Sequence, residues 1–406
     1  MKTFRASIDL LATRRFGTFW CASLLSSIGT WAQQVAEPWL LLSLGASPFL
    51  IGLDSFAMNA PVWLLTLVGG ALADRADRRR VIAIFQSIQM LCPTAITVLL
   101  LTRTVEPWMI IVISVVVGVT DALSMPSFQS IVPSLVPRDQ IGRGLALNST
   151  QFNLSRILGP AIAGVLMSKG SVMACFIVSA ASYVPFIGVA LWILPRRAHE
   201  TSPSPRHPFA GAGEILRVRH LRGALLTVLT TSVLCSPLVT FTPVLVRGVF
   251  HQSPRGLSTA LAAFGAGGLL GAAALLGIAP TLDPRRLSSG SAIAYAAVLV
   301  LAALSPRFWA LPPLLVLAGA SMTVSNTAAN SHLQSTTNPR LLGQTVSLYM
   351  LAMRGGLSLG ALLTGATANL LGVRNALLLN GLAAVVIQTV QARSWRRASL
   401  LESNPG

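Results

Sequence analysis

The chain has 406 residues, of which 53% are hydrophobic and 10% are charged, whereas about 25% of residues are charged in an average soluble domain. This composition argues against a soluble globular enzyme. The net charge of +18 comes from 30 Lys or Arg against 12 Asp or Glu, an excess that also occurs in nucleic-acid-binding proteins. The positions of the basic residues decide between that interpretation and a membrane protein.

Long apolar runs follow one another along the whole chain. A helix needs about 20 mostly apolar residues to cross a bilayer, and twelve runs meet this requirement: 16–44, 49–73, 81–102, 107–131, 144–168, 171–194, 221–249, 255–279, 287–305, 308–331, 344–371 and 373–393. The runs are too long for buried strands and lack the alternation of an outer-membrane barrel. The first run has no signal-peptide cleavage pattern. The sequence therefore predicts an all-α membrane protein with twelve transmembrane helices.

Basic residues concentrate in alternate intervals between the runs. One side of the membrane receives 22 Lys or Arg and the other side six, while Arg156 and Arg354 lie inside apolar runs. Cytoplasmic loops carry the excess of Lys and Arg, so both termini are predicted to be cytoplasmic. The positive charge is thus a topology signal, and we expect a bilayer around the chain and no nucleic-acid partner.

The residue types that hold metals or perform catalysis form no recognisable site. Four Cys lie inside apolar runs without close pairs, as expected of small buried side chains. Five His show no metal-ligand spacing, and no nucleotide-binding loop or hydrolase motif occurs. The sequence predicts no catalytic residue, no metal and no cofactor, and therefore a protein that is not an enzyme.

The longest polar stretch divides the chain into six runs and six runs. We predict a six-helix bundle at 1–194, a cytoplasmic linker at 195–220 and a second six-helix bundle at 221–406. Within the linker, residues 214–221 form either a short amphipathic helix, with Ile215, Leu216 and Leu221 facing lipid, or a disordered segment.

A faint internal repeat supports the division. Gly118 and Pro137-Arg138 recur as Gly319 and Pro339-Arg340, about 201 residues later. The next span carries one arginine in each half, Arg156 and Arg354. A repeat of six spans in the same orientation is typical of transporters whose substrate path lies between the halves, near the bilayer midplane.

The loop after the second run reads Gly70-Ala-Leu-Ala-Asp74-Arg75-Ala-Asp77-Arg78-Arg79-Arg80. It resembles the signature loop of the major facilitator superfamily in both text and position, although Asp77 stands where that family has a second glycine. A carboxylate at this place can accept hydrogen bonds from the N-terminus of a neighbouring helix, and the resemblance implies the helix that begins near Gln344. The alternative is simple anchoring by the arginines. The predicted gating residues are Gly70, Asp74, Arg75 and Arg78.

Two further motifs bear on coupling. Gly159-Pro160 and Gly164 resemble part of the antiporter motif of the same superfamily, and ordinary close packing of helices is the alternative explanation. The superfamily also links an arginine in the fourth span with proton coupling, but Ser114 occupies that place, four residues before Gly118. Any proton relay must therefore use other residues.

Several stretches narrow the resemblance, among them those around Trp31, Pro137, Asn148 and Arg354. Together they resemble the bacterial twelve-span exporters related to the enterobactin exporter, over most of the chain. The resemblance implies the major facilitator fold, a place in the bacterial inner membrane, a monomer, and outward movement of a small organic cargo.

Charged residues inside apolar runs are functional candidates because a charge in the bilayer is costly. The proton-coupling candidates are Glu37, Asp121 and Asp54. Gln33 and Gln34 share a helical face with Glu37, and we expect this face to look into the cavity. A structural hydrogen bond is the alternative for Glu37, and an exposed helix start is the alternative for Asp54.

The basic residues in the runs suggest contacts to cargo or to acids. Asp121 and Arg156 lie at matching depths in neighbouring spans, which predicts an ion pair. Arg354 has no nearby acid in its half and is predicted to bind an anionic cargo or helix-end carbonyls. The cargo-binding candidates are Gln33, Gln34, Arg156, Arg354, Asn326 and Asn330.

These observations favour a secondary active transporter that exports a small amphiphilic organic molecule, siderophore-like or drug-like, by alternating access and proton antiport. One alternative is an uncoupled facilitator or an importer of a small organic solute. The other is a membrane scaffold or sensor that transports nothing. Scarce His and unpaired Cys count against metal-ion export.

Overall fold

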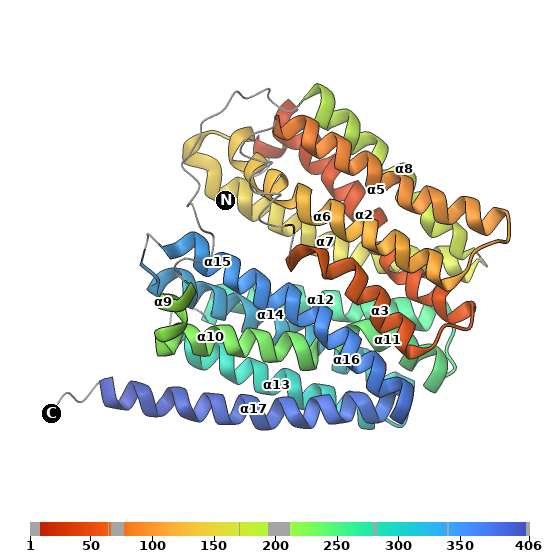
Figure 1. The fold of residues 1–406 in the computed structure, drawn as a ribbon. Coiled ribbons are helices and arrows are strands. Elements are labelled where there is room, and N and C mark those ends of the chain that lie inside the picture. The colour runs from red at the N-terminus through yellow and green to blue at the C-terminus, as the bar shows by residue number, and fades with distance from the viewer. Residues whose placement is uncertain are drawn as a thin grey trace. The chain divides into compact units, whose positions relative to one another are not determined.

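A computed structural model of the chain describes residues 9–63, 65, 77–169, 171–193, 212–278, 282–338 and 341–402. Every element in these ranges is helical (Figure 1). The prediction of an all-α protein is therefore confirmed for the described part of the chain.

The chain divides into two compact units. Unit 1 comprises 1–45, 60–204 and 253–262, and unit 2 comprises 46–59, 205–252 and 263–406. Each unit consists mainly of one half of the sequence, but the short segments 46–59 and 253–262 belong with the helices of the opposite half. The predicted boundaries at 194 and 221 stay a prediction.

The described residues of unit 1 form five long helices and one short turn. They are α2 (Arg14–Ser43), α5 (Arg78–Leu101), α6 (Pro107–Leu135), the 3₁₀ turn η1 (Arg138–Gln140), α7 (Ile141–Ser168) and α8 (Val172–Trp192). Helix α2 packs against α7 and α8, and α8 also packs against α5. Helix α2 therefore lies between α7 and α8, and its side chains Gln33 and Glu37 are buried inside unit 1.

Packed aromatic rings and a close glycine contact hold unit 1 together at two places along α2. Phe19 lies 5.9 Å from both Phe128 and Phe186, measured between ring centroids, in one buried cluster. Further along α2, a Cβ atom placed on Gly159 of α7 would lie 2.3 Å from Cβ of Trp31. Only a residue without a side chain permits this approach of α7 to α2.

Unit 2 contains the remaining elements. They are α3 (Pro48–Asn59), α9 (Ala212–Arg217), α10 (Arg219–Thr230), the π-helix η2 (Thr231–Cys235), α11 (Pro237–Val244), the π-helix η3 (Leu245–Val249), α12 (Pro254–Ile278), α13 (Pro284–Leu304), the 3₁₀ turn η4 (Phe308–Ala310), α14 (Leu311–Thr336), α15 (Leu342–Met350), the π-helix η6 (Leu351–Gly355), α16 (Gly356–Leu371) and α17 (Val373–Glu402). The first residues of α12 belong to unit 1. Helix α13 packs against α14 and α17, and α3 packs against α16.

Close glycine contacts hold the segments 46–59 and 253–262, here called the crossing segments, against helices of the opposite half of the sequence. A Cβ atom on Gly52 of α3 would lie 2.4 Å from the carbonyl oxygen of Ala361 on α16. A Cβ atom on Gly164 of α7 would lie 2.4 Å from Cβ of Ser258, at the start of α12. Both approaches need glycine, so these small residues determine where the crossing segments pack.

Nine helical segments of the described chain are long and apolar enough to cross a membrane. They are 79–101, 107–125, 172–192, 219–249, 254–275, 284–304, 308–336, 342–371 and 373–393. Each coincides with a predicted run. The membrane character of the fold is thus supported, while the count of twelve spans stays a prediction.

The described part of the predicted linker, which belongs to unit 2, differs from one expectation. A short helix does form at Ala212–Arg217, and Leu216 is exposed. Ile215 and Leu221, however, do not face lipid. They are buried in a cluster with Leu333 of α14 and Tyr349 of α15, because packing against the bundle buries their apolar surface more completely than one exposed face would.

Candidate functional site

A buried carboxyl group lies at the centre of a polar network in unit 1. Glu37 of α2 is 2% exposed. The Ser114 hydroxyl, on α6, donates to Glu37 Oε1 at 2.7 Å, and Gln33 Nε2 donates to Glu37 Oε2 at 3.4 Å. The Ser179 hydroxyl, on α8, donates to Gln33 Oε1 at 2.8 Å. Three helices thus hold one carboxyl group.

Burial differs among the polar residues of this helix face. Gln33 and Glu37 are both buried, whereas Gln34 is half-buried, and the expectation that this face looks into the cavity stays a prediction. Both side chains that donate to the Glu37 carboxyl group are neutral. The residue at the place of the superfamily's coupling arginine, Ser114, is one of them.

A second set of polar groups lies beside the first. The Tyr183 hydroxyl of α8 is 3.1 Å from the Thr30 hydroxyl of α2. Tyr183 is also close enough to Glu37, Asp121 and Cys92 to interact with them electrostatically. Two of the three proton-coupling candidates therefore lie near one tyrosine.

Sequence reasoning did not single out Ser114 as a partner of Glu37, nor Ser179 and Tyr183. One signal was available for the last two, because they are polar residues four apart on one face of an apolar run.

Arg156 has an aromatic neighbour that was not predicted. Its guanidinium carbon lies 5.5 Å from the centroid of the Trp31 ring on α2, a distance that gives a favourable cation–π interaction. Phe152 contacts the same ring edge-on, with centroids 6.0 Å apart. The predicted ion pair between Asp121 and Arg156 stays a prediction. These residues offer a basic and aromatic surface on unit 1.

Asp54 lies in α3, within unit 2. It is 6% exposed, so it is not the exposed helix start that was one interpretation of this residue.

The predicted gating loop is described only at its end. Gly70, Asp74 and Arg75 lie outside the described residues, and Arg78 begins α5 without a described side chain. Asp77 caps α5, because its carboxylate accepts a hydrogen bond from the Arg79 amide at 3.0 Å. A glycine at this position would have no side chain to accept that hydrogen bond, so Asp77 adds a capping interaction where the family has a glycine.

The same cap recurs in the second half. The Asp283 carboxylate accepts from the Arg285 amide at 2.9 Å, at the start of α13. Helices α5 and α13 thus begin in the same way, with an Asp carboxylate that accepts a hydrogen bond from the backbone amide of an Arg two residues later. This similarity extends the internal repeat.

Arg354 lies in a π-helical turn of unit 2, η6, and is half-buried. Such turns are rare and often occur at functional sites. The following residues pack on a second π-helix, η2. A Cβ atom on Gly356 would lie 2.7 Å from Cβ of Ser232, and one on Gly360 would lie 2.2 Å from the Val233 carbonyl oxygen. The two irregular turns therefore lie against each other.

An amide from α17 braces the turn η2. Gln388 is fully buried and its Nε2 donates to the Thr227 carbonyl oxygen and to the Thr231 hydroxyl, both at 3.1 Å. The Thr231 hydroxyl itself donates to the Thr227 carbonyl oxygen at 2.8 Å. Polar side chains thus satisfy the backbone where the regular helix ends.

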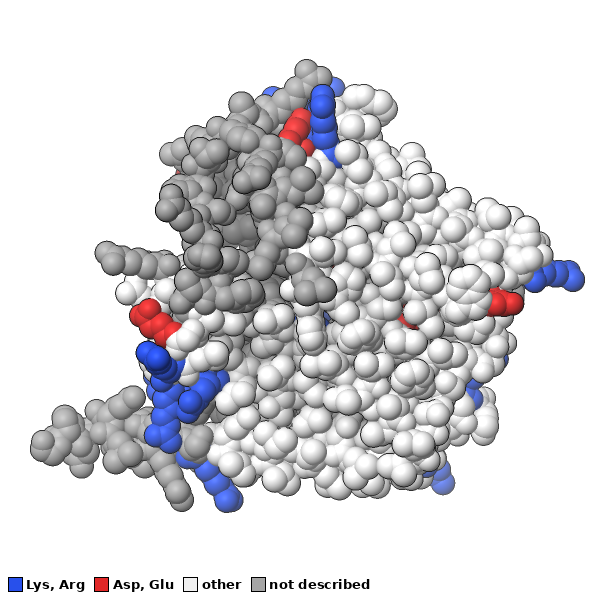
Figure 2. Space-filling model, in the orientation of Figure 1, with Lys and Arg blue, Asp and Glu red and all other residues white. Residues whose placement is uncertain are grey.

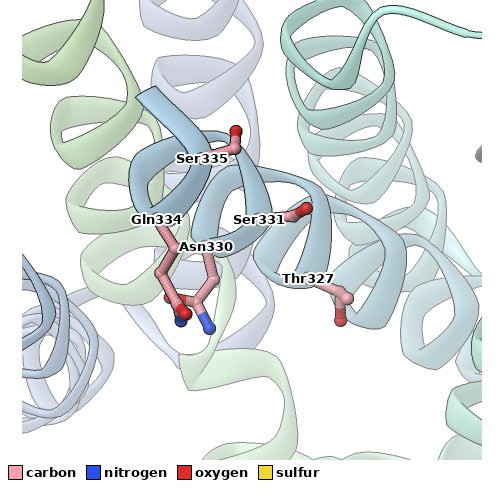
Figure 3. A pocket seen from close by; sticks show the side chains of 5 residues that line it. All are labelled: Thr327, Asn330, Ser331, Gln334 and Ser335. Carbon is pink, nitrogen blue, oxygen red and sulfur yellow. The ribbon is translucent and has the colours of Figure 1, made fainter. Parts of the chain in front are cut away.

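A polar pocket of about 470 Å³ opens along α14 in unit 2 (Figure 3). Asn330 and Gln334 point the same way from successive turns of α14, and Gln334 Nε2 donates to Asn330 Oδ1 at 3.0 Å. The full lining comprises Thr327, Asn330, Ser331, Gln334 and Ser335. Exposed polar groups in a spanning helix are costly against hydrocarbon, so this face suits an aqueous path better than lipid.

Asn326 is not among the residues that line this pocket. Its carbonyl oxygen accepts a hydrogen bond from the Tyr349 hydroxyl at 3.3 Å. In the described residues no group of three His, Cys, Asp or Glu side chains is arranged to hold a metal ion.

The described residues form an all-helical fold with long apolar helices, as in a multi-pass membrane protein. The family model described as "Transmembrane secretion effector" matches residues 6–403. The chain belongs to this family, which is part of the major facilitator superfamily. It is therefore a multi-pass membrane transporter rather than an enzyme, as the sequence predicts.

Curated relatives agree with the family. The chain is 23% identical to macrolide efflux protein A of Streptococcus pyogenes over 384 residues, which cover 93% of this chain and 95% of the relative. It is 30% identical to the staphyloferrin A transporter of Staphylococcus aureus over 174 residues, or 43% of each chain.

The predicted relation to enterobactin exporters is also confirmed. The chain is 24% identical to the enterobactin exporter EntS of Shigella boydii over 208 residues, which cover 50% of this chain and 47% of the relative. Among solved structures, the nucleoside transporter NupG matches with a TM-score of 0.73 at 12% identity, over 94% of this chain and 99% of the other. At this identity the likeness concerns the fold alone.

Proposed function

We propose that the chain is a twelve-span secondary active transporter of the bacterial inner membrane, with both termini in the cytoplasm. It exports a small amphiphilic organic molecule, siderophore-like or drug-like, in exchange for protons. The relatives named for macrolide efflux, staphyloferrin A transport and enterobactin export support this cargo class. Alternating access of the two halves moves the cargo, and the signature loop around Asp74 closes the cytoplasmic side.

The network around Glu37 carries the proposal of proton coupling. A Ser hydroxyl donates to a carboxylate and accepts from a carboxylic acid equally well, since its hydrogen rotates. Ser114 can therefore satisfy the Glu37 carboxyl group in both protonation states. The other donor, Gln33, is also neutral, so neither contact is an ion pair that has to break when a proton binds. Asp121, which also lies near Tyr183, is the second candidate.

Cargo-binding candidates occur in both units. Arg156 and Trp31 of unit 1 offer positive charge and an aromatic ring. Asn330 of unit 2 belongs to a neutral pocket rich in hydrogen-bonding groups, and Arg354 lies in the π turn η6. Neutral polar, aromatic and basic groups together suit an amphiphilic organic molecule better than a bare ion.

The coupling claim is tested in proteoliposomes with an imposed pH gradient, using a macrolide, staphyloferrin A and enterobactin as cargo probes. We expect the gradient to drive accumulation, and we expect Glu37→Gln to abolish this drive while leaving exchange of cargo without a gradient. Glu106→Gln is the matched control, because Glu106 is an exposed carboxylate outside the spans. Transport that ignores the gradient in the unmodified protein, or gradient-driven transport that survives Glu37→Gln, refutes the coupling.

The rival functions give different results. An uncoupled facilitator or importer shows exchange of the same size with and without the gradient. A scaffold or sensor shows no difference in exported metabolites between cells with and without the gene. Comparison of all exported metabolites in such cells also identifies the cargo.

A further inference from the structure

Arginine side chains gather at one end of unit 2. Figure 2 shows Lys and Arg concentrated over the region where α9, α10 and α13 begin. Arg217, Arg219, Arg222 and Arg286 are exposed, and Arg285 is half-buried. We call these five residues the arginine cluster.

The members of the cluster lie on elements that are in contact. Helix α10 packs against α13, α14 and α17, and α9 packs against α10. The His220 ring of α10 lies 5.6 Å from the His332 ring of α14, between centroids, and Arg285 is close enough to His332 to interact with it electrostatically. The first turns of α10 and α13 therefore converge on the same buried histidine.

Two acids lie within the same region but leave the cluster basic. Glu214 and Asp283 are exposed. One carboxylate oxygen of Asp283 already accepts the hydrogen bond from the Arg285 amide that caps α13. Five arginines against two acids leave an excess of positive charge that a partner anion can neutralise.

An exposed apolar row continues from the cluster along α10. Arg222, Leu226 and Leu229 are separated by four and three residues, so they lie on one face of the helix. Both leucines are exposed, at 40% and 36%. The row begins with a positive charge and runs on along the helix as hydrocarbon.

A second row on α13 has the same order. Arg286 is followed on one exposed face by Gly290, Ala294, Ala297 and Leu301. The small residues leave a shallow strip next to the helix backbone, and Leu301 at its far end is 54% exposed. A phospholipid has a matching shape, because its charged headgroup can lie at the arginine and its acyl chains can lie along the apolar strip.

We propose that the arginine cluster binds the headgroup of an anionic phospholipid, whose acyl chains lie along the exposed rows of α10 and α13. Guanidinium groups bind phosphate oxygens through two parallel hydrogen bonds, and clusters of basic residues beside membrane helices attract anionic headgroups. The apolar rows favour a lipid over a soluble phosphate compound, which has nothing to place on them. This site does not depend on the proposed transport function.

The test measures lipid binding to the full-length protein in detergent, by native mass spectrometry, with dioleoylphosphatidylglycerol and dioleoylphosphatidylcholine as probes. We expect the anionic lipid to bind at least about tenfold more tightly. The triple variant Arg219→Gln, Arg222→Gln, Arg286→Gln removes this preference. The matched control is Arg103→Gln, Arg255→Gln, Arg307→Gln, which removes three exposed arginines at other helix ends and leaves the preference unchanged.

A second variant separates lipid from free anion. Leu226→Ser with Leu229→Ser keeps every charge and shortens the apolar row, so we expect weaker binding of phosphatidylglycerol. Inorganic pyrophosphate is not expected to displace the lipid. Equal binding of both lipids, loss of the preference in the control variant, or displacement by pyrophosphate overturns the proposal.

Discussion

The packing of α3 on α16 leads to a prediction whose size follows from the geometry. In Gly52→Ala the new Cβ atom would lie 2.4 Å from the Ala361 carbonyl oxygen and 3.0 Å from Cα of Gly365, whereas ordinary contact begins at 3.4 Å. The obstacle is backbone, which cannot rotate away. The two helices must therefore separate by about 1 Å, and such overpacking costs about 1–3 kcal/mol.

Two further glycines provide graded comparisons. In Gly365→Ala the nearest atom is the Pro48 carbonyl oxygen at 3.0 Å, so a shift of a few tenths of an ångström is enough and the cost is smaller. In Gly343→Ala, within α15, no atom lies within 4 Å of the new Cβ atom. This variant gains helix propensity of up to about 1 kcal/mol and is not expected to lose stability.

Thermal unfolding of the purified full-length protein in detergent measures the series. We expect the apparent Tm of Gly343→Ala to equal or exceed that of the unmodified protein, that of Gly365→Ala to be lower, and that of Gly52→Ala to be lowest. An unchanged Tm for Gly52→Ala contradicts the close approach of α3 to α16. A lower Tm for Gly343→Ala than for Gly52→Ala contradicts the use of Cβ distances as a guide.

Three other substitutions are measured in the same way. Glu37→Leu removes the carboxyl oxygens that accept hydrogen bonds from Ser114 and Gln33, and each such bond contributes about 0.5–1.5 kcal/mol, so the Tm of this variant falls below that of Glu37→Gln, which keeps an acceptor. Equal Tm values for the two variants argue against the network. Phe186→Ala leaves a cavity beside Phe19 and costs about 3–5 kcal/mol, and a loss below about 1 kcal/mol argues against a packed aromatic cluster. Gln388→Leu removes both amide hydrogen bonds to the turn η2 and lowers the Tm, whereas an unchanged value shows that the turn is stable without them.

The sequence predicts the helices well because a spanning helix is a local property. Twenty or so apolar residues suffice to define it, and the predicted run 373–393 begins where α17 begins, at Val373. The end of α17 at Glu402 was not predictable from hydropathy, because the last turns are polar. The π-helices η2, η3 and η6 could not be predicted from the sequence either, because a π turn changes the backbone hydrogen bonds without changing the apolar pattern.

Tertiary contacts explain what the sequence missed. Glu37 stands out because it is a charge in an apolar run, but its partner Ser114 lies 77 residues away and is an ordinary small residue of a spanning helix. Only the packing of α6 beside α2 brings the two together. Ile215 illustrates the same limit, because its position in an amphipathic pattern indicates that it is covered but not whether lipid or protein covers it.

The crossing segments 46–59 and 253–262 have a consequence for fragments of the chain. Cutting the chain between 195 and 220 yields two polypeptides, each of which lacks a packing partner that the other supplies. The first fragment carries Gly52 without Ala361, and the second carries Ser258 without Gly164. Two fragments produced in the same cell therefore have specific surfaces through which to reassemble, while either fragment produced alone leaves a glycine-lined face uncovered.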